Sequence, residues 1–177
     1  MRKLSLKELN RVTPEAFKQQ AKTPFVLVLD NVRSALNVGS AFRTADSFAL
    51  EKIYLCGITA QPPHREILKT AIGATDSVDW EYFENTNLAI NELRKNGFQI
   101  IAVEQAEEST FLQEYDFKKS EKIALVFGNE VTGITDEVMD QIDECIEVPQ
   151  YGTKHSLNIS VCVGVVVWEL FRKWKFK

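Results

Sequence analysis

Short apolar runs rich in Val, Ile and Leu recur along the chain and alternate with segments whose apolar residues have helical spacing. Because buried parallel strands read as continuous apolar runs, these short runs are predicted to be strands. The predicted strands are FVLVLD (25–30), KIYLCG (52–57), FQIIAVE (98–104), KIALVFG (122–128), CIEVP (145–149) and the less apolar SVDWEYF (77–83). The predicted helices span 37–49, 64–72, 86–95, 135–142 and 157–174. This alternation indicates an α/β fold, with a mainly parallel sheet covered by helices on both faces.

The length of 177 residues favours one domain with its own core. We expect residues 1–22 to form a short basic N-terminal helical arm. One or two helices are expected there, separated at Thr13-Pro14, because the residue before a proline avoids helical backbone. Residues 23–177 are expected to form the main domain, which ends in a basic tail.

Charge is unevenly distributed along the chain, whose net charge is −4. Residues 1–22 carry a net charge of +4, residues 170–177 another +4, and the remainder −12. Basic ends on an acidic body suggest terminal arms that contact a polyanion. Ends that are simply solvated would have the same composition, so charge alone leaves both interpretations open.

Three polar loops follow predicted strands, at the edge where open α/β sheets bind ligands. In the first, NVRSALNVGSAFRTAD (31–46), Asn37 is a candidate helix cap. Arg43 is expected near the apolar side of the helix. There it either pairs with a carboxylate such as Glu130 or offers its planar fork to a phosphate.

The second loop, FGNEVTGI (127–134), contains two glycines that permit positive φ and close backbone approach. Its exposed backbone groups can hold a polar small molecule, or the segment is a tight turn with Thr135 capping the next helix. It is not a P-loop, because no Lys-Ser/Thr pair follows Gly133.

The third loop, YGTKHSLNIS (151–160), directly precedes the most apolar run of the chain. Ser156 is expected to cap a helix that begins near Leu157, with Asn158 in its first turn. The exposed N–H groups of such a helix end favour an anionic or polar ligand. A capped helix whose polar residues bind neighbouring loops is the alternative.

Taken together, the three loops contain an ordered set of motifs. These are Asn-x-Gly-x₃-Arg-Thr-Ala (37–45), Phe-Gly-x-Glu-x₂-Gly (127–133) and Pro-x₂-Gly-x₃-Ser-Leu-Asn-x-Ser (149–160). Each motif alone is modest, but the ordered set resembles the three motifs of the SpoU family of RNA ribose 2′-O-methyltransferases, within the SPOUT superfamily. The resemblance spans about residues 25 to 170 and implies a C-terminal trefoil knot in the α/β fold.

The resemblance implies S-adenosylmethionine as cofactor, bound in a bent form in a pocket made by the knot. The cofactor-binding positions that match are Gly128, Val148 and Leu157. Arg43 matches the family's catalytic arginine. Since a guanidinium stays protonated, we expect Arg43 to bind the phosphate and polarise the ribose hydroxyl rather than act as a free base.

Further catalytic positions follow from the same resemblance, which implies that Asn37, Glu130, Ser156 and Asn158 hold Arg43 and the ribose. It also implies a homodimer in which the C-terminal helix packs across a two-fold axis. Gly164 would permit close helix approach there, and Trp168, Phe171 and Trp174 would supply apolar surface. A helix buried in the core of one chain would have the same apolar sequence pattern.

RNA is the implied partner, and the short N-terminal segment favours tRNA over rRNA, with a D-loop guanosine as the expected target. Two alternatives stay open: an rRNA methyltransferase, and a catalytically silent RNA-binding module of the same fold. A nucleotide-binding protein of flavodoxin-like order is a third. The acidic stretch 104–110 is interpreted as a solvated loop that, less plausibly, borders the cofactor.

Metal and membrane binding have no support in the sequence. His64 and His155 form no metal-ligand cluster, and the three cysteines have no CxxC spacing, which favours reduced buried thiols. No apolar run reaches the length of a membrane span. We therefore expect a cytoplasmic protein that uses no metal.

Overall fold

The computed structural model describes residues 1–5 and 7–176. Its helices are the 3-10 helix η1 (Lys7–Leu9), α1 (Pro14–Gln19), α2 (Ala35–Ser47), α3 (Arg65–Ala71), α4 (Ala74–Ser77), α5 (Thr86–Lys95), α6 (Asp136–Met139) and α7 (Ile159–Phe176). Its strands are β1 (Thr23–Asp30), β2 (Leu50–Cys56), β3 (Trp80–Phe83), β4 (Phe98–Val103), β5 (Thr110–Phe111), β6 (Lys122–Phe127) and β7 (Glu144–Glu147).

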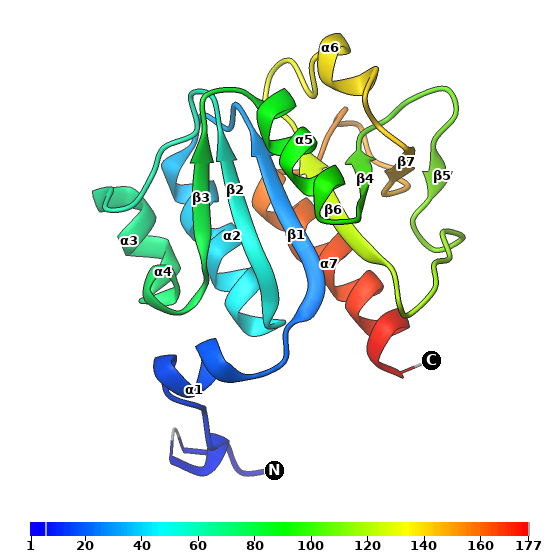
Figure 1. Ribbon diagram of the computed structural model, residues 1–177. Coiled ribbons are helices and arrows are strands. Elements are labelled where there is room, and N and C mark those ends of the chain that lie inside the picture. The colour runs from blue at the N-terminus through cyan, green and yellow to red at the C-terminus, as the bar shows by residue number, and fades with distance from the viewer. Residues whose placement is uncertain (6, 177) are drawn as a thin grey trace.

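The strands form one sheet in the order β3-β2-β1-β6-β4-β7-β5, in which every pair of neighbours is parallel. The central strand β1 pairs with β2 on one side and β6 on the other, so that Leu27 lies opposite Ile53 and Leu125. Because all strands run the same way, their carboxyl ends share one edge of the sheet (Figure 1). The predicted α/β fold with a parallel sheet is confirmed.

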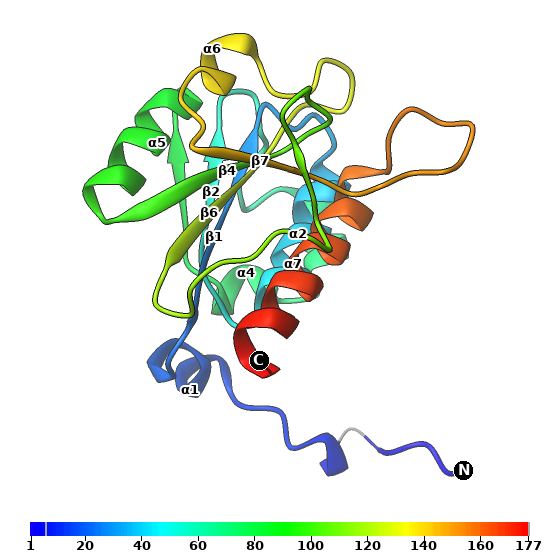
Figure 2. The same cartoon turned by 90° about the vertical axis from the view of Figure 1, so that its right-hand side faces the viewer.

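Helices cover both faces of the sheet (Figures 1 and 2). Helices α2 and α7 lie on one face together with α3 and α4, and α5 lies on the other. Side chains alternate along β1 accordingly: Phe25, Leu27 and Leu29 enter the core under α2 and α7, whereas Val26 and Val28 enter the core under α5. This period of two explains why β1 is apolar at nearly every position.

Element boundaries agree with the predictions to within a few residues, with three exceptions. Residues 74–77 form α4, so only Trp80–Phe83 of the predicted strand 77–83 pairs in the sheet. Strand β5 has two residues and was not predicted, since so short a strand carries no pattern. Helix α6 covers only the first half of the predicted 135–142.

Two predicted helix caps are wrong. The side chain of Ser34, not Asn37, caps α2 by accepting a hydrogen bond from the Asn37 N–H (3.3 Å). Helix α7 begins at Ile159, and the Asn158 side-chain oxygen accepts from the backbone N–H of Ser160 (2.9 Å), a role that the sequence suggested for Ser156. Both errors arise because several adjacent residues are good caps, and only the loop path selects one.

The N-terminal segment extends away from the body (Figure 2). Helix α1 begins at Pro14 and is capped by the Thr13 side chain, in line with the predicted break. Phe17 of α1 is buried in the main core, which attaches this helix to the domain. Leu4, Leu9 and Val12 before it are exposed. The predicted basic arm thus has an anchored helix and a protruding segment.

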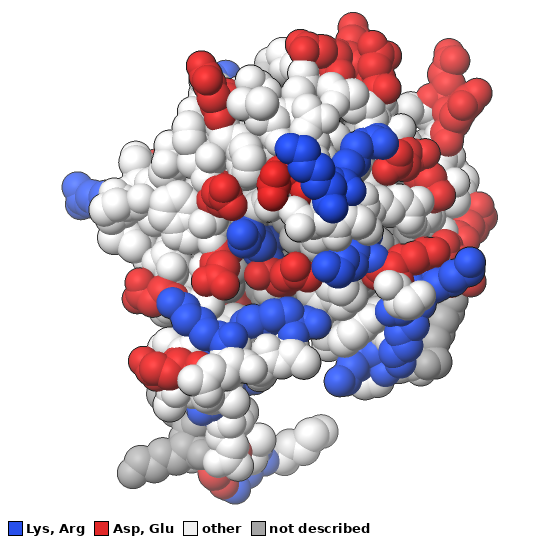
Figure 3. All heavy atoms as spheres, in the orientation of Figure 1, with Lys and Arg blue, Asp and Glu red and all other residues white. Residues whose placement is uncertain are grey.

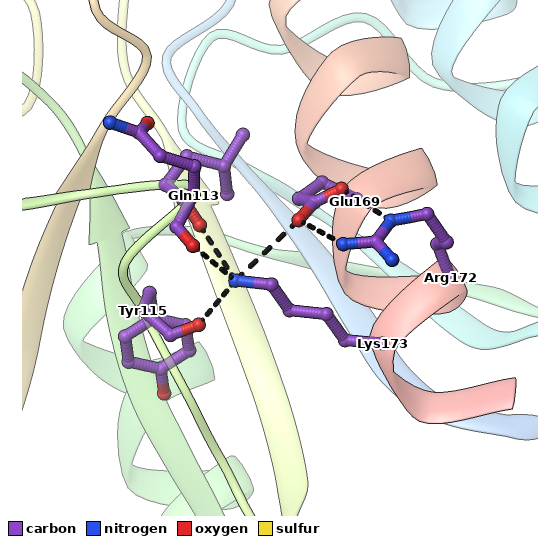
Figure 4. Close-up of polar contacts among 6 residues, drawn as sticks. Gln113, Tyr115, Glu169, Arg172 and Lys173 are labelled. Carbon is purple, nitrogen blue, oxygen red and sulfur yellow. Dashed lines mark hydrogen bonds and ion pairs between the residues drawn. The ribbon is translucent and has the colours of Figure 1, made fainter. Parts of the chain in front are cut away.

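One buried cation ties the C-terminal helix to the β5 region (Figure 4). Lys173 Nζ donates hydrogen bonds to the backbone oxygens of Leu112 (3.1 Å), Gln113 (3.1 Å) and Tyr115 (2.5 Å). Glu169 lies 3.5 Å from the same ammonium and also pairs with Arg172. Lys173 is therefore not available to an external polyanion. The basic tail expected from the sequence has one cation fewer to offer to such a partner.

Candidate active site

A cavity of about 710 Å³ lies at the carboxyl ends of β4, β6 and β7, three adjacent strands of the sheet. Six of the eight predicted site residues line it, and all six lie in the loops that follow β6 and β7. They are Gly128, Glu130, Val148, Ser156, Leu157 and Asn158. The volume is within the range of small-molecule pockets. These residues span 30 positions of the sequence, from Gly128 to Asn158, and the parallel sheet brings them to one edge.

The loop after β6 is closed on itself by its glycines and Asn129. Asn129 and Gly133 exchange backbone hydrogen bonds of 3.0 and 2.9 Å, and Gly133 has a φ of +68°. A Cβ on Gly128 would lie 2.3 Å from the backbone carbon of Gly133, so no other residue fits at 128. Asn129 also donates to the Asn31 carbonyl (2.7 Å), which fixes this loop to the end of β1.

Glu130 joins the first motif to the second. Its carboxylate accepts hydrogen bonds from the backbone N–H groups of Arg33 (2.8 Å) and Ser34 (3.0 Å) and from the Asn37 side chain (3.1 Å). Asn158 of the third motif donates to the Asn37 side-chain oxygen (3.3 Å). A polar chain Glu130–Asn37–Asn158 therefore connects all three motifs. An ion pair of Arg43 with Glu130, one of the two alternatives left open for Arg43, is absent, and the Glu130 carboxylate is used by these other donors.

The pKa of the Glu130 carboxyl lies below its ordinary value. Burial would raise this pKa, but the hydrogen bonds from Arg33, Ser34 and Asn37 to the ionised form outweigh burial. A lowered pKa means that ionisation of Glu130 stabilises the folded chain. This stabilisation is fully present above the ordinary carboxyl pKa of 4.5 and is lost as the pH falls through the lower folded-state pKa.

Glu130→Gln is expected to lower the melting temperature at neutral pH, because the amide supplies one acceptor oxygen where the carboxylate supplies two. The gap between wild type and variant should shrink as the pH falls below the ordinary carboxyl pKa of 4.5 and through the lower folded-state pKa of Glu130, where the wild-type side chain also becomes protonated. Thermal unfolding followed by circular dichroism from about pH 7 to pH 3 measures this gap. A gap of constant size over the whole range would contradict the assignment of the stabilisation to Glu130.

The cavity is lined by acidic rather than basic side chains. Glu104, Glu130, Asp136 and Glu147 line it, and the described lining residues include no Lys or Arg. Figure 3 shows acidic side chains gathered at the same edge of the molecule, over α6. A negative potential suits a cationic ligand and opposes a phosphate group, so the cavity is not a phosphate site.

The third motif forms the outer wall of the cavity. Val148 is half-buried, whereas Ser156, Leu157 and Asn158 lie in an exposed loop. The Gln105 side chain donates to the His155 carbonyl (2.8 Å), so the loop after β7 is held to the loop after β4. His155 is itself one of the residues that line the cavity.

Arg43 lies outside this cavity. It is exposed, contrary to the expectation that it sits near the apolar side of α2, and it lines a separate hollow together with Lys69 and Gly164. Asn37 and Arg43 are six residues apart on one helix, which turns them about 120° away from each other. The structure thus joins Asn37, Glu130 and Asn158, and it leaves Arg43 apart from them within one chain.

The sequence interpretation missed two acidic cavity residues, Asp136 and Glu147, and discounted a third, Glu104. Glu104, Asp136 and Glu147 lie at the carboxyl edge of the sheet, and Glu104 accepts hydrogen bonds from the N–H groups of Gln105 (2.9 Å) and Ile134 (3.3 Å). Their position just after β4 and at the end of β7 was a usable signal. Of the stretch 104–110, Glu104, Gln105 and Ala106 line the cavity. That the stretch borders the cofactor, the less favoured interpretation, stays a prediction.

Thiol and metal chemistry are not supported around the cavity. Burial raises the pKa of Cys56 to about 12 and that of Cys162 to about 11, so these thiols stay protonated at neutral pH. Within residues 1–5 and 7–176, no group of three His, Cys, Asp or Glu side chains has the arrangement of a metal site. The helices described there include none that is both long and apolar enough to cross a membrane.

Comparisons with known proteins converge on one group. The model of the SpoU rRNA Methylase family matches residues 24–168. A tRNA (guanosine(18)-2′-O)-methyltransferase of Aquifex aeolicus is 31% identical over 94% of this chain and 77% of its own length. A 23S rRNA (guanosine-2′-O-)-methyltransferase of Neisseria meningitidis is 29% identical over 90% of this chain and 62% of its own.

Solved structures agree with these matches. The crystal structure of the A. aeolicus TrmH/SpoU tRNA modifying enzyme superposes with a TM-score of 0.77 at 28% identity, over 90% of this chain and 79% of that one. The crystal structure of an AdoMet-bound rRNA methyltransferase from Sinorhizobium meliloti gives a TM-score of 0.79 at 27% identity, over 93% of this chain and 60% of that one.

Proposed function

The protein belongs to the SpoU family of RNA ribose 2′-O-methyltransferases, and we propose from this premise that its substrate is tRNA, at a guanosine of the D-loop. Its methyl donor is S-adenosylmethionine. The observation that supports tRNA is the similarity to the A. aeolicus tRNA (guanosine(18)-2′-O)-methyltransferase. The cavity at the ends of β4, β6 and β7, which the second and third motifs line together, supports methyl transfer itself. The trefoil knot is proposed with it, on the resemblance of the motifs.

The cavity fits the cofactor in size and in charge. Gly128, Val148 and Leu157 line it and would hold the cofactor, chiefly through backbone groups. The methyl donor carries a sulfonium and an α-ammonium, so the acidic lining attracts it. When bound, the cofactor supplies a methyl group that leaves sulfur as a bond to the ribose oxygen forms.

The residues of this chain would then orient the acceptor. Arg43 binds the phosphate beside the target ribose and polarises its 2′-hydroxyl, and the hydroxyl proton passes to a phosphate oxygen. The Glu130–Asn37–Asn158 chain holds the loops around the cavity, and Asn158 is exposed, so it would be free to contact the acceptor ribose. Ser156, which lines the cavity without a capping role, is assigned to ribose contact.

A homodimer is proposed to complete the site, because Arg43 lies in a hollow separate from the cavity. Helix α7 leaves Val161, Val165 and Trp168 exposed by 52%, 40% and 47%, which is more apolar surface than a solvated helix face needs. A Cβ on Gly164 would meet nothing within 4 Å, so a second helix has room to approach there. Arg43 of one copy would then face the cavity of the other.

Phe171 and Trp174 contribute to the core more than to this surface. Phe171 packs on Phe48 with a ring distance of 5.2 Å, and Trp174 packs on Phe25 at 6.4 Å. Trp168 also packs on Phe48, with a ring distance of 6.0 Å, but it is exposed whereas Phe171 and Trp174 are half-buried. Of the three aromatic residues expected at the two-fold axis, Trp168 therefore has the most surface available to it. We propose a cytoplasmic location, where tRNA is found.

Methyl transfer to purified RNA fractions tests the substrate. The protein is incubated with S-adenosylmethionine carrying a labelled methyl group and with unmodified tRNA transcripts or unmodified rRNA. We expect label in tRNA, at a rate that exceeds transfer to rRNA by tenfold or more. Preferential labelling of rRNA would show that the substrate is rRNA, as in the name of the Neisseria relative, and not tRNA. No labelling of either RNA would favour a silent RNA-binding module.

A further inference from the structure

The hollow that contains Arg43 contains a second cation. It has a volume of about 530 Å³, lies between α2, α3 and α7, and is lined by Arg43 and Lys69 together with small and apolar residues. None of its described lining residues is acidic. Both cations are exposed, Arg43 on α2 and Lys69 in the last turn of α3. The hollow is therefore positive where the cofactor cavity is negative.

Neither cation is neutralised by the chain itself. The ion pairs found among the described residues involve other cations, and Arg94 and Arg172, for example, are paired with Asp143 and Glu169. Three of the hydroxyls that line the hollow are used within the chain, because those of Ser40, Ser47 and Thr70 donate to backbone carbonyls. Arg43 and Lys69 thus supply the charged hydrogen-bond donors that an anion in the hollow would meet.

The close packing of α3 on α2 fixes where Lys69 is anchored relative to Arg43. A Cβ on Gly39 would lie 2.2 Å from the Thr70 hydroxyl and 2.3 Å from the Ile67 carbonyl oxygen, so glycine is needed for this approach. The Thr70 hydroxyl donates to the Leu36 carbonyl (2.8 Å) and ties the two helices together. The glycine of the first motif therefore has a physical role: it brings α3, and with it Lys69, against the helix of Arg43.

We infer that Lys69 binds a backbone phosphate of the RNA next to the target ribose, as a second phosphate-binding residue beside Arg43. This inference rests on the proposed function, since the RNA is its ligand. The two cations differ in task. A guanidinium offers a planar fork that can orient a hydroxyl and a phosphate, whereas an ammonium acts as a point charge. Lys69 should therefore affect RNA affinity, and Arg43 the rate of transfer.

Lys69→Ala tests the inference in a salt titration. Binding of unmodified tRNA transcripts is measured by fluorescence anisotropy across a range of KCl concentrations. The variant should bind about tenfold more weakly at low salt, and its slope of log K against log salt should fall by roughly 0.7 to 0.9, the loss of one phosphate contact. S-adenosylmethionine affinity, measured by calorimetry, should be unchanged, because Lys69 does not line the cofactor cavity.

Lys95→Ala is the matched control. Lys95 is an exposed lysine in the last turn of α5, on the opposite face of the sheet. If Lys69→Ala has the same affinity and the same salt slope as Lys95→Ala, the inference is wrong. The outcome is separate from that of the proposed function: methyl transfer by wild type with no Lys69 effect removes the inference alone. Absence of transfer by wild type removes the proposed function, while the salt slope still reports on Lys69.

Discussion

Arg43→Ala is expected to reduce methyl transfer to tRNA by roughly 10³-fold, the size of effect seen when one transition-state donor is removed. The reason is that the substitution removes the group assigned to hold the phosphate and polarise the hydroxyl. Transfer of a labelled methyl group under single-turnover conditions measures the loss. Arg43→Lys should recover only part of the rate, since an ammonium keeps the charge but not the planar fork.

Two further measurements separate this role from a structural one. Arg43 is exposed and lines a hollow other than the cofactor cavity, so the melting temperature and the S-adenosylmethionine affinity of Arg43→Ala should match those of wild type. If Arg43→Ala retains more than about a tenth of the wild-type rate, Arg43 is not the catalytic arginine. If it loses cofactor affinity instead, Arg43 acts in binding S-adenosylmethionine and not in orienting the ribose.

Lys173→Met is expected to cost about 3 to 5 kcal/mol of folding free energy, the range found when one partner of a buried charged contact is removed. Lys173 is 6% exposed and donates to three backbone carbonyls, two of them buried, and methionine leaves all three without this donor. The loss should lower the melting temperature by roughly 10 °C in a domain of this size. Chemical and thermal unfolding measure it.

Lys118→Met provides the comparison for this result. Lys118 is an exposed lysine in the segment that Lys173 holds, and its substitution should change stability by less than about 0.5 kcal/mol. Equal stability of the two variants would show that the contacts of Lys173 stabilise nothing in solution. Strand β5 lies at the edge of the sheet and pairs only with β7, so the contacts of Lys173 are expected to help hold it in place. We therefore also expect the segment 110–119 to exchange its amide hydrogens faster in Lys173→Met.

The sequence predicted the fold well where a residue's neighbours decide its structure. Continuous apolar runs gave β1, β4 and β6 nearly to the residue, since a strand buried on both faces has few alternatives. Prediction from the sequence failed where the path of the chain in the tertiary structure decides which residue caps a helix. Ser34, Asn37, Ser156 and Asn158 are all adequate helix caps, and the sequence alone does not say which loop end becomes the first turn.

The site shows the same limit. The motif order predicted that Gly128, Val148 and Leu157 would meet, and parallel strands ending at one edge explain why they do. The position of Arg43 was not predictable from its apolar neighbours in sequence, because residues on either side of a helical position point in other directions. The role of Gly39 was also hidden, since its contact, the Ile67 carbonyl, lies on another helix.

This chain transfers a methyl group to a ribose oxygen and not to a base. The transfer reaction with labelled S-adenosylmethionine and unmodified tRNA, digested to nucleosides and separated by chromatography with mass detection, tests it most directly. Wild type should give label in 2′-O-methylguanosine, and Arg43→Ala should give almost none. Label on a nucleobase, or equal labelling by the two proteins, would contradict it.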